Sequence, residues 1–147
     1  MSLDGLYREI LLDHYQNPRN QGTMDDADTA SHGHSPLCGD EIDVFVKLRG
    51  DLLDDVRFSG RGCSISQASA SMMTQSVKGH EVADAEEMAA GFRAMMLENG
   101  VLPARPEMED LEALQGVKKF PVRVKCALLP WSTLKEALET YRTRKTS

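Results

Sequence analysis

The stretch EIDVFVKLRGDLLDDVRFSGRGCSISQASASMMTQSV, residues 41–77, changes from an alternating to a helical spacing of apolar residues. Its first part has the period of a strand with one buried face, carried by Ile42, Val44, Val46 and Leu48. Arg-Gly-Asp at 49–51 supplies a turn, and apolar residues from Leu52 to Phe58 carry a second strand back. We therefore predict an antiparallel hairpin followed by a helix.

That helix is predicted to begin next to Cys63. Ser64 and Gln67 fit a capping box, which places Cys63 just before the first helical turn. The glycines in GRGC, residues 60–63, carry no side chain and let another part of the backbone approach closely. A helix N-terminus also favours a thiolate, through its dipole and its unsatisfied N–H groups. Cys63 is therefore a candidate for metal binding or chemistry, beside the plainer interpretation of a buried structural cysteine.

The residues before the hairpin predict a helix and then a long loop. Apolar residues between Leu3 and Tyr15 recur at helical spacing, and Asn17-Pro18 ends the pattern. Residues 20–37 are rich in Gly, Asp, Ser and Pro, which indicates a loop with room for one short edge strand.

The residues after the first long helix predict further helices. Asp84 and Glu87 fit a second capping box, whose helix ends at Asn99-Gly100, and a short helix is expected at 109–116. Residues 120–129 remain open between strand and helix, because Pro121 can open a helix while Val122 and Val124 alternate. We expect Pro130 in the first turn of a last helix, and a frayed tail at 140–147.

The predicted fold is α+β, with a small antiparallel sheet of about three strands and helices packed on it. The 147 residues suit one domain, 1–147. With 41% hydrophobic and 27% charged residues, the composition is that of a globular chain rather than a disordered one. The five methionines between Met72 and Met96, and Trp131, are expected mainly in the core.

Charge and hydropathy narrow the function classes. A formal net charge of −6 argues against nonspecific nucleic-acid binding. No apolar run approaches the roughly 20 residues of a membrane span. The N-terminus lacks the basic region of a signal peptide, so we expect a cytoplasmic protein without nucleic-acid or membrane partners.

The three cysteines, Cys38, Cys63 and Cys126, each stand near a predicted junction between elements. An odd count in a chain without an export signal argues against a disulfide framework. Three thiolates and one further donor would make a tetrahedral zinc site. The fourth ligand is open between Asp40 and the pair His32 and His34, which lie near Cys38 in the sequence.

Four blocks of the chain resemble the IscU/NifU N-terminal family of iron–sulfur cluster assembly proteins. They are LYREILLDHYQNPRN, PLCGDEI, FSGRGCSISQASASMMT and RVKCALLPW, in the family's order and with all three cysteines in place. The chain is most similar to the SufU branch of that family. Lys125 stands where scaffolds of the IscU type carry a histidine, and residues 98–117 resemble an insertion typical of the SufU branch.

This resemblance implies a zinc site made of Cys38, Asp40, Cys63 and Cys126, with His32 and His34 in a loop. It also implies a sulfurtransferase role, in which Cys38 accepts persulfide sulfur from a SufS-type cysteine desulfurase and passes it toward downstream iron–sulfur assembly proteins. Arg123 is a candidate for steadying the anionic sulfur, or else a solvent-facing side chain.

Two other functions remain open. The first is a scaffold that holds a transient [2Fe–2S] cluster on the same residues. The second is a zinc-stabilised adaptor without chemistry, which would tolerate Cys38→Ser.

Overall fold

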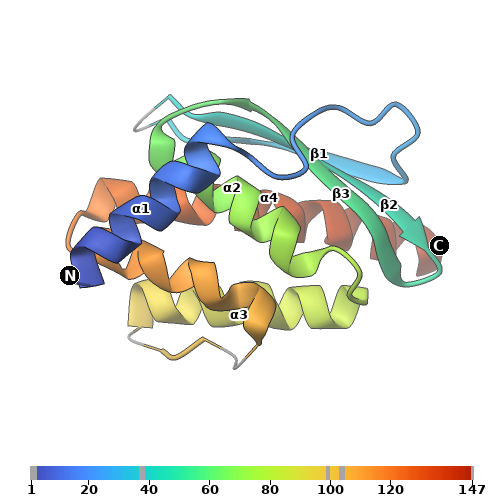
Figure 1. Ribbon diagram of the computed structural model, residues 1–147. Helices are drawn as coiled ribbons and strands as arrows, with labels where there is room; N and C mark the ends of the chain where they lie inside the picture. The colour runs from blue at the N-terminus through green and yellow to red at the C-terminus, as the bar shows by residue number, and fades with distance from the viewer. Residues whose placement is uncertain (1–2, 37–38, 99, 103–104, 147) are drawn as a thin grey trace.

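The computed structural model describes residues 3–36, 39–98, 100–102 and 105–146. A helix is followed by three strands and then by further helices (Figure 1). Their bounds are α1 Leu3–Gln16, β1 Thr29–His34, β2 Glu41–Arg49, β3 Leu52–Arg61, α2 Ser64–Val77, α3 Val82–Glu98, the 3-10 helix η1 Pro106–Val117, and α4 Pro121–Thr146. This order confirms the α+β class.

The strands form one antiparallel sheet in the order β1-β2-β3. β2 and β3 pair as the predicted hairpin, with Val44 opposite Phe58, and turn at Gly50, whose φ is 64°. β1 lies within residues 20–37, where the sequence allowed one short edge strand. It contains His32 and His34, so the expectation of a loop there was wrong: both histidines pair with β2.

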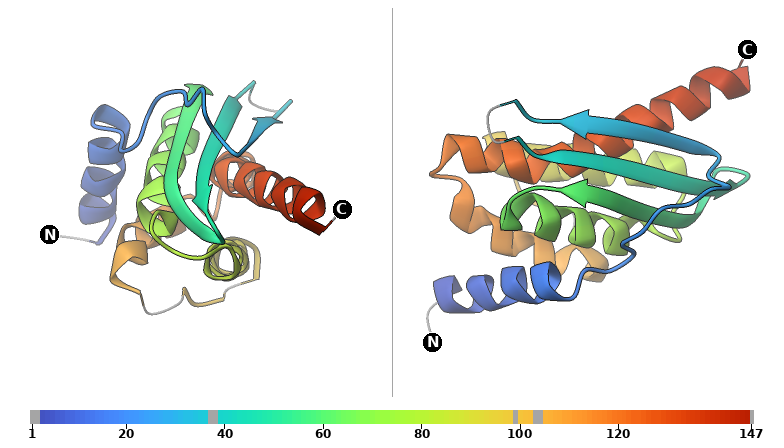
Figure 2. Two further views of the ribbon diagram at one scale, coloured as in Figure 1. Left: turned by 90° about the vertical axis from the view of Figure 1, so that its right-hand side faces the viewer. Right: turned by 90° about the horizontal axis from the view of Figure 1, so that it is seen from above.

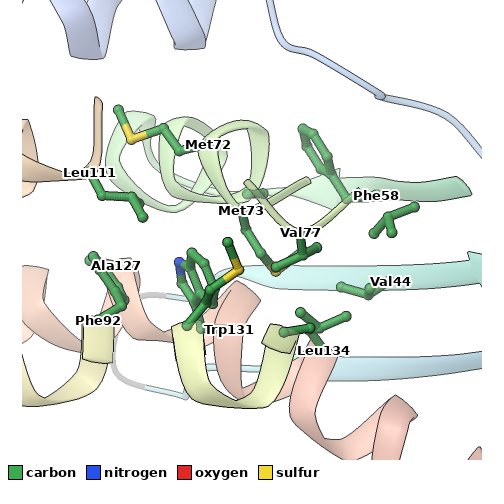
Figure 3. Packing of buried hydrophobic residues seen from close by; sticks show 14 of the residues in the cluster. Val44, Phe58, Met72, Met73, Val77, Phe92, Leu111, Ala127, Trp131 and Leu134 are labelled. Atoms are coloured by element: carbon green, nitrogen blue, oxygen red, sulfur yellow. The ribbon is translucent and has the colours of Figure 1, made fainter. Parts of the chain in front are cut away.

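Helices cover one face of the sheet. α2 packs on β3, and α4 packs on β1 and β2, as the two views in Figure 2 show. The core lies between the sheet and these helices, and α3 closes it from below (Figure 3). Phe92 of α3 stacks on Trp131 of α4 with ring centroids 5.2 Å apart. The methionines expected in the core, Met72, Met73, Met88, Met95 and Met96, are all buried, as is Trp131.

A buried histidine joins the N-terminal helix to this core. His14 of α1 is fully buried, and its Nδ1 lies 2.8 Å from Ser71 Oγ of α2. Its Nε2 lies 2.7 Å from Asp110 Oδ2 of η1. η1, which forms the last part of the segment resembling the SufU insertion, is therefore packed against α1, and its Met108, Leu111 and Leu114 are buried in the core.

The last helix corrects two expectations. α4 runs unbroken from Pro121 to Thr146, so Pro121 does open a helix, while Pro130 lies inside it rather than in its first turn. An interior proline costs a helix about 3 kcal/mol. Fully burying one large apolar side chain contributes about 1.5–3 kcal/mol, and α4 buries Trp131, Leu134 and Leu138 against the core. Packing therefore outweighs the local penalty.

Residues 140–146 are helical rather than frayed. Tertiary contacts hold this end of α4. The Tyr141 hydroxyl donates to the Gly50 carbonyl at 2.9 Å, and Arg142 pairs with Glu86 at 2.7 Å. The Arg144 guanidinium donates to the carbonyl of Asp28. These partners are distant in the sequence, so the local pattern did not indicate them.

The two predicted capping boxes are also corrected. α2 begins at Ser64 with Cys63 as its N-cap, so Ser64 is the first helical residue and not the cap. α3 begins at Val82, two residues before Asp84. Each start lies near the predicted position. At α3 the Val82 N–H donates to the Asp51 carbonyl at 2.8 Å, a partner distant in the sequence.

Candidate metal centre

Three of the four residues implied as metal ligands lie together at one end of the sheet. Asp40 precedes β2, Cys63 is the N-cap of α2, and Cys126 lies in the second turn of α4. A carboxylate oxygen of Asp40 and the two sulfurs all lie within 4.8 Å of one another. Asp40 is 2% exposed, Cys126 is fully buried and Cys63 is half-buried. The group thus opens to solvent mainly on the side of Cys63.

Asp40 caps α2 as well as facing the sulfurs. Its Oδ1 accepts a hydrogen bond from the Cys63 backbone N–H at 2.9 Å, and its Oδ2 lies 3.5 Å from the Cys63 sulfur, which donates as a thiol. A carboxylate is favoured at this end of a helix because the dipole and the free N–H groups are positive there. Sequence reasoning missed this cap, since Asp40 and Cys63 are 23 positions apart and no local pattern links them.

Glycine makes this close approach possible. A Cβ built on Gly62 would lie 2.7 Å from Asp40 Cγ and Oδ1, and 2.6 Å from Ser66 Oγ. A Cβ on Gly60, whose φ is 133°, would lie 2.3 Å from the Glu41 carbonyl oxygen. The close backbone approach predicted from GRGC is therefore present. The segment that approaches these glycines is the one that carries Asp40 and Glu41.

The remaining candidate residues are placed as follows. Cys38 lies outside the described residues. Gly39 has a φ of 72° and donates its N–H to the Ser35 carbonyl at 2.8 Å. Arg123 is exposed in the first turn of α4, three residues before Cys126, and its role stays a prediction.

The two histidines considered as the fourth ligand are not part of this group. Among the described residues, the cluster contains Asp40, Cys63 and Cys126, and neither His32 nor His34. Both histidines are exposed on β1. Of the two alternatives that the residues left open, the geometry favours Asp40.

The donor set fits a zinc ion. Zinc is bound by thiolates and carboxylates in tetrahedral sites, with Zn–S bonds of about 2.3 Å, which puts two sulfurs about 3.8 Å apart. Donor atoms already within 4.8 Å need only a small closure to reach this spacing. Binding would require both thiols to lose their protons.

No helix in the described part of the chain has both the length and the apolar character needed to cross a membrane.

Comparison with known proteins gives a consistent result. Residues 6–147 match the family described as NifU-like N-terminal domain. The chain is 46% identical to the zinc-dependent sulfurtransferase SufU of Bacillus subtilis, over 93% of this chain and 92% of that protein. It is 40% identical to the iron–sulfur cluster assembly scaffold protein IscU of Streptococcus pyogenes, over 93% of this chain and 85% of that one.

Among solved structures, it resembles a candidate iron–sulfur cluster assembly scaffold protein for the SUF system from Fervidobacterium islandicum. The TM-score is 0.78 at 34% identity, and the match covers 88% of this chain and 94% of that one.

Proposed function

This chain belongs to the NifU-like N-terminal domain family, and on that premise we propose that it is a zinc-dependent sulfurtransferase acting in iron–sulfur cluster assembly. Its sulfur donor would be a cysteine desulfurase of the SufS type. Support comes from the relative of 46% identity, which is a zinc-dependent sulfurtransferase, and from the site itself. The single observation that carries the proposal is the convergence of Asp40, Cys63 and Cys126 within 4.8 Å.

The proposed zinc ligands are Cys38, Asp40, Cys63 and Cys126. Zinc bound there would supply a positive charge that keeps the thiols deprotonated and shields them from oxidation. The chain's part is to hold the donors. Asp40 is fixed by the N–H group of Cys63, and Cys126 is fixed inside α4. Cys38 is separated from Asp40 only by Gly39, whose left-handed backbone conformation an L side chain rarely adopts.

The proposed reaction uses Cys38 as the acceptor. Its thiolate attacks the outer sulfur of the partner's cysteine persulfide, and the new S–S bond forms as the partner's S–S bond breaks. The products are a persulfide on Cys38 and a thiolate on the partner, so no external oxidant or reductant is needed. Asp40 is a harder donor than sulfur, which suits a site that must release one thiolate while keeping the others.

The test is the rate of alanine formation from free cysteine by the desulfurase, with and without the zinc-loaded chain. We expect strong stimulation by the wild type and none by Cys38→Ala. Exposed Lys135 of α4, nine residues after Cys126, offers a control, because Lys135→Gln should keep both the fold and the stimulation. A desulfurase rate that the wild-type chain leaves unchanged would refute the proposal.

A scaffold function is the second candidate, because a relative of 40% identity is an IscU scaffold protein. In that case the cargo would be a [2Fe–2S] cluster held by the same donors. Anaerobic reconstitution with iron and sulfide tests it through the visible absorption of the cluster. A stable cluster in the wild type, lost in Cys63→Ala, would favour the scaffold function, and a chain that keeps zinc and binds no iron would exclude it.

A further inference from the structure

The outer face of the sheet carries two histidines that the proposed sulfur transfer does not use. His32 and His34 lie two residues apart on the edge strand β1, and both are exposed. Gly33 between them faces α4 so closely that a Cβ there would lie 2.0 Å from Thr133 Oγ1. Since successive side chains of a strand point to opposite faces, this contact sends both imidazoles to the face away from the helices.

A carboxylate on the neighbouring strand orients one of these rings. Asp43 of β2 is the direct cross-strand partner of His32, and its Oδ1 lies 2.9 Å from His32 Nδ1. When Nδ1–H donates to this carboxylate, Nε2 carries the lone pair that can bind a metal ion. Metal-binding histidines nearly always have such a carboxylate or carbonyl partner on the nitrogen that does not bind the metal. The side chains of His32 and Asp43 are 54% and 42% exposed, so an ion can reach the ring from solvent.

The second imidazole has an acidic neighbour as well. His34 is the cross-strand partner of Glu41, whose carboxylate pairs with Arg61 at 3.4 Å. Two rings at positions i and i+2 of a strand stand side by side, so both can bind one ion, and water can complete its coordination. Imidazole nitrogen suits zinc, nickel, copper and ferrous iron, and not magnesium or calcium.

We propose that His32 and His34 form a second metal site, which binds a divalent first-row transition-metal ion through their ring nitrogens, with Asp43 as the positioning residue. The site is distinct from the candidate metal centre, whose cluster of donor atoms includes neither histidine. With two protein ligands instead of four, it would exchange its ion readily. Metal binding at this site does not depend on sulfur transfer.

The proposed histidine site lies at the same end of the sheet as Asp40. β1 ends at His34, β2 begins at Glu41 directly after Asp40, and the Ser35 N–H donates to the Asp40 carbonyl at 2.9 Å. Figure 2 shows this strand at the edge of the sheet, beside α4. The two histidines therefore lie toward the end of the sheet where Asp40 and Cys63 meet. A cation held there would lie at the same end of the sheet as the candidate metal centre.

The test is calorimetric titration of the zinc-loaded chain, free of any affinity tag, with Ni²⁺ at pH 7.5. The expected result is one Ni²⁺ per chain in addition to the resident zinc. His32→Ala and His34→Ala should each weaken this binding at least about tenfold, because the second ring no longer binds an ion already held by the first. Asp43→Asn should weaken it about tenfold, as losses of such partners do.

His80 provides the matched control. It also has a carboxylate partner, Glu107 Oε1 at 2.9 Å from Nε2, but no second histidine two residues away. His80→Ala should leave the titration unchanged. Nuclear magnetic resonance adds a readout that a purely structural role would not affect: Ni²⁺ should broaden the ring signals of His32 and His34 before those of His80. Absence of bound Ni²⁺, or equal affinity in wild type and both alanine variants, would overturn the proposal.

Discussion

Replacement of Gly62 by alanine tests whether Asp40 is held in place for a metal ion. The φ of Gly62 lies outside the left-handed region, so alanine adds no backbone strain and acts only through its Cβ. That Cβ would lie 2.7 Å from the Asp40 carboxylate, whereas ordinary contact begins at 3.4 Å. The carboxylate would therefore have to move by about 0.7 Å. Metal sites tolerate about 0.2 Å in ligand distance, so this shift is too large for unchanged binding.

The expected result is a loss of zinc affinity of at least about tenfold, which corresponds to ~1.4 kcal/mol. Stability of the metal-free chain should fall by about 1–3 kcal/mol, as is usual for overpacking at a close contact. Competition between the chain and a chromophoric chelator measures the affinity, and urea unfolding measures the stability. Asp40→Asn is a companion variant, because it keeps an oxygen for the cap of α2 while removing the charge.

Gly116→Ala is the matched control, since a Cβ at this position of η1 meets nothing within 4 Å. It should leave zinc affinity unchanged. The reasoning would be refuted if folded Gly62→Ala bound zinc within twofold of the wild type. In that case Asp40 either moves without cost or is not a ligand, and the behaviour of Asp40→Asn separates these explanations.

Three further predictions concern contacts outside the candidate metal centre. Gly33→Ala should destabilise the chain by about 1–3 kcal/mol, because its Cβ would lie 2.0 Å from Thr133 Oγ1, and Thr133→Ala should restore part of the loss in urea unfolding. His14→Ala should cost about 2–4 kcal/mol, because it empties a buried site and breaks two hydrogen bonds; a loss below about 1 kcal/mol would contradict the proposed link between α1 and the core. The hydrogen bond from Arg19 holds the pKa of Asp13 below its usual 3.8. The pair therefore contributes stability above pH 3.8, and this contribution is lost as the pH falls through the lowered pKa. Arg19→Gln should raise the Asp13 pKa in a nuclear magnetic resonance titration, and an unchanged pKa would contradict the pairing.

Short-range patterns were sufficient for much of the fold. Alternation from Ile42 to Leu48 and the turn at Gly50 specify the hairpin, because strand faces have a period of two and the turn accepts a positive φ. The end of α1 near Asn17-Pro18 follows from local chemistry too, since proline disfavours a helical residue before it. The resemblance then placed the candidate ligands, and the structure brings Asp40, Cys63 and Cys126 together.

Long-range contacts settled the rest, because they join residues that share no local pattern. α4 continues through Pro130 since the burial of its apolar face outweighs one lost hydrogen bond, and that balance depends on the sheet it covers. Asp40 lies against Cys63 because Gly62 leaves room for it, and His32 faces solvent because Gly33 lies against α4. Each of these positions is a property of two surfaces in contact, so it is defined only once the chain has folded.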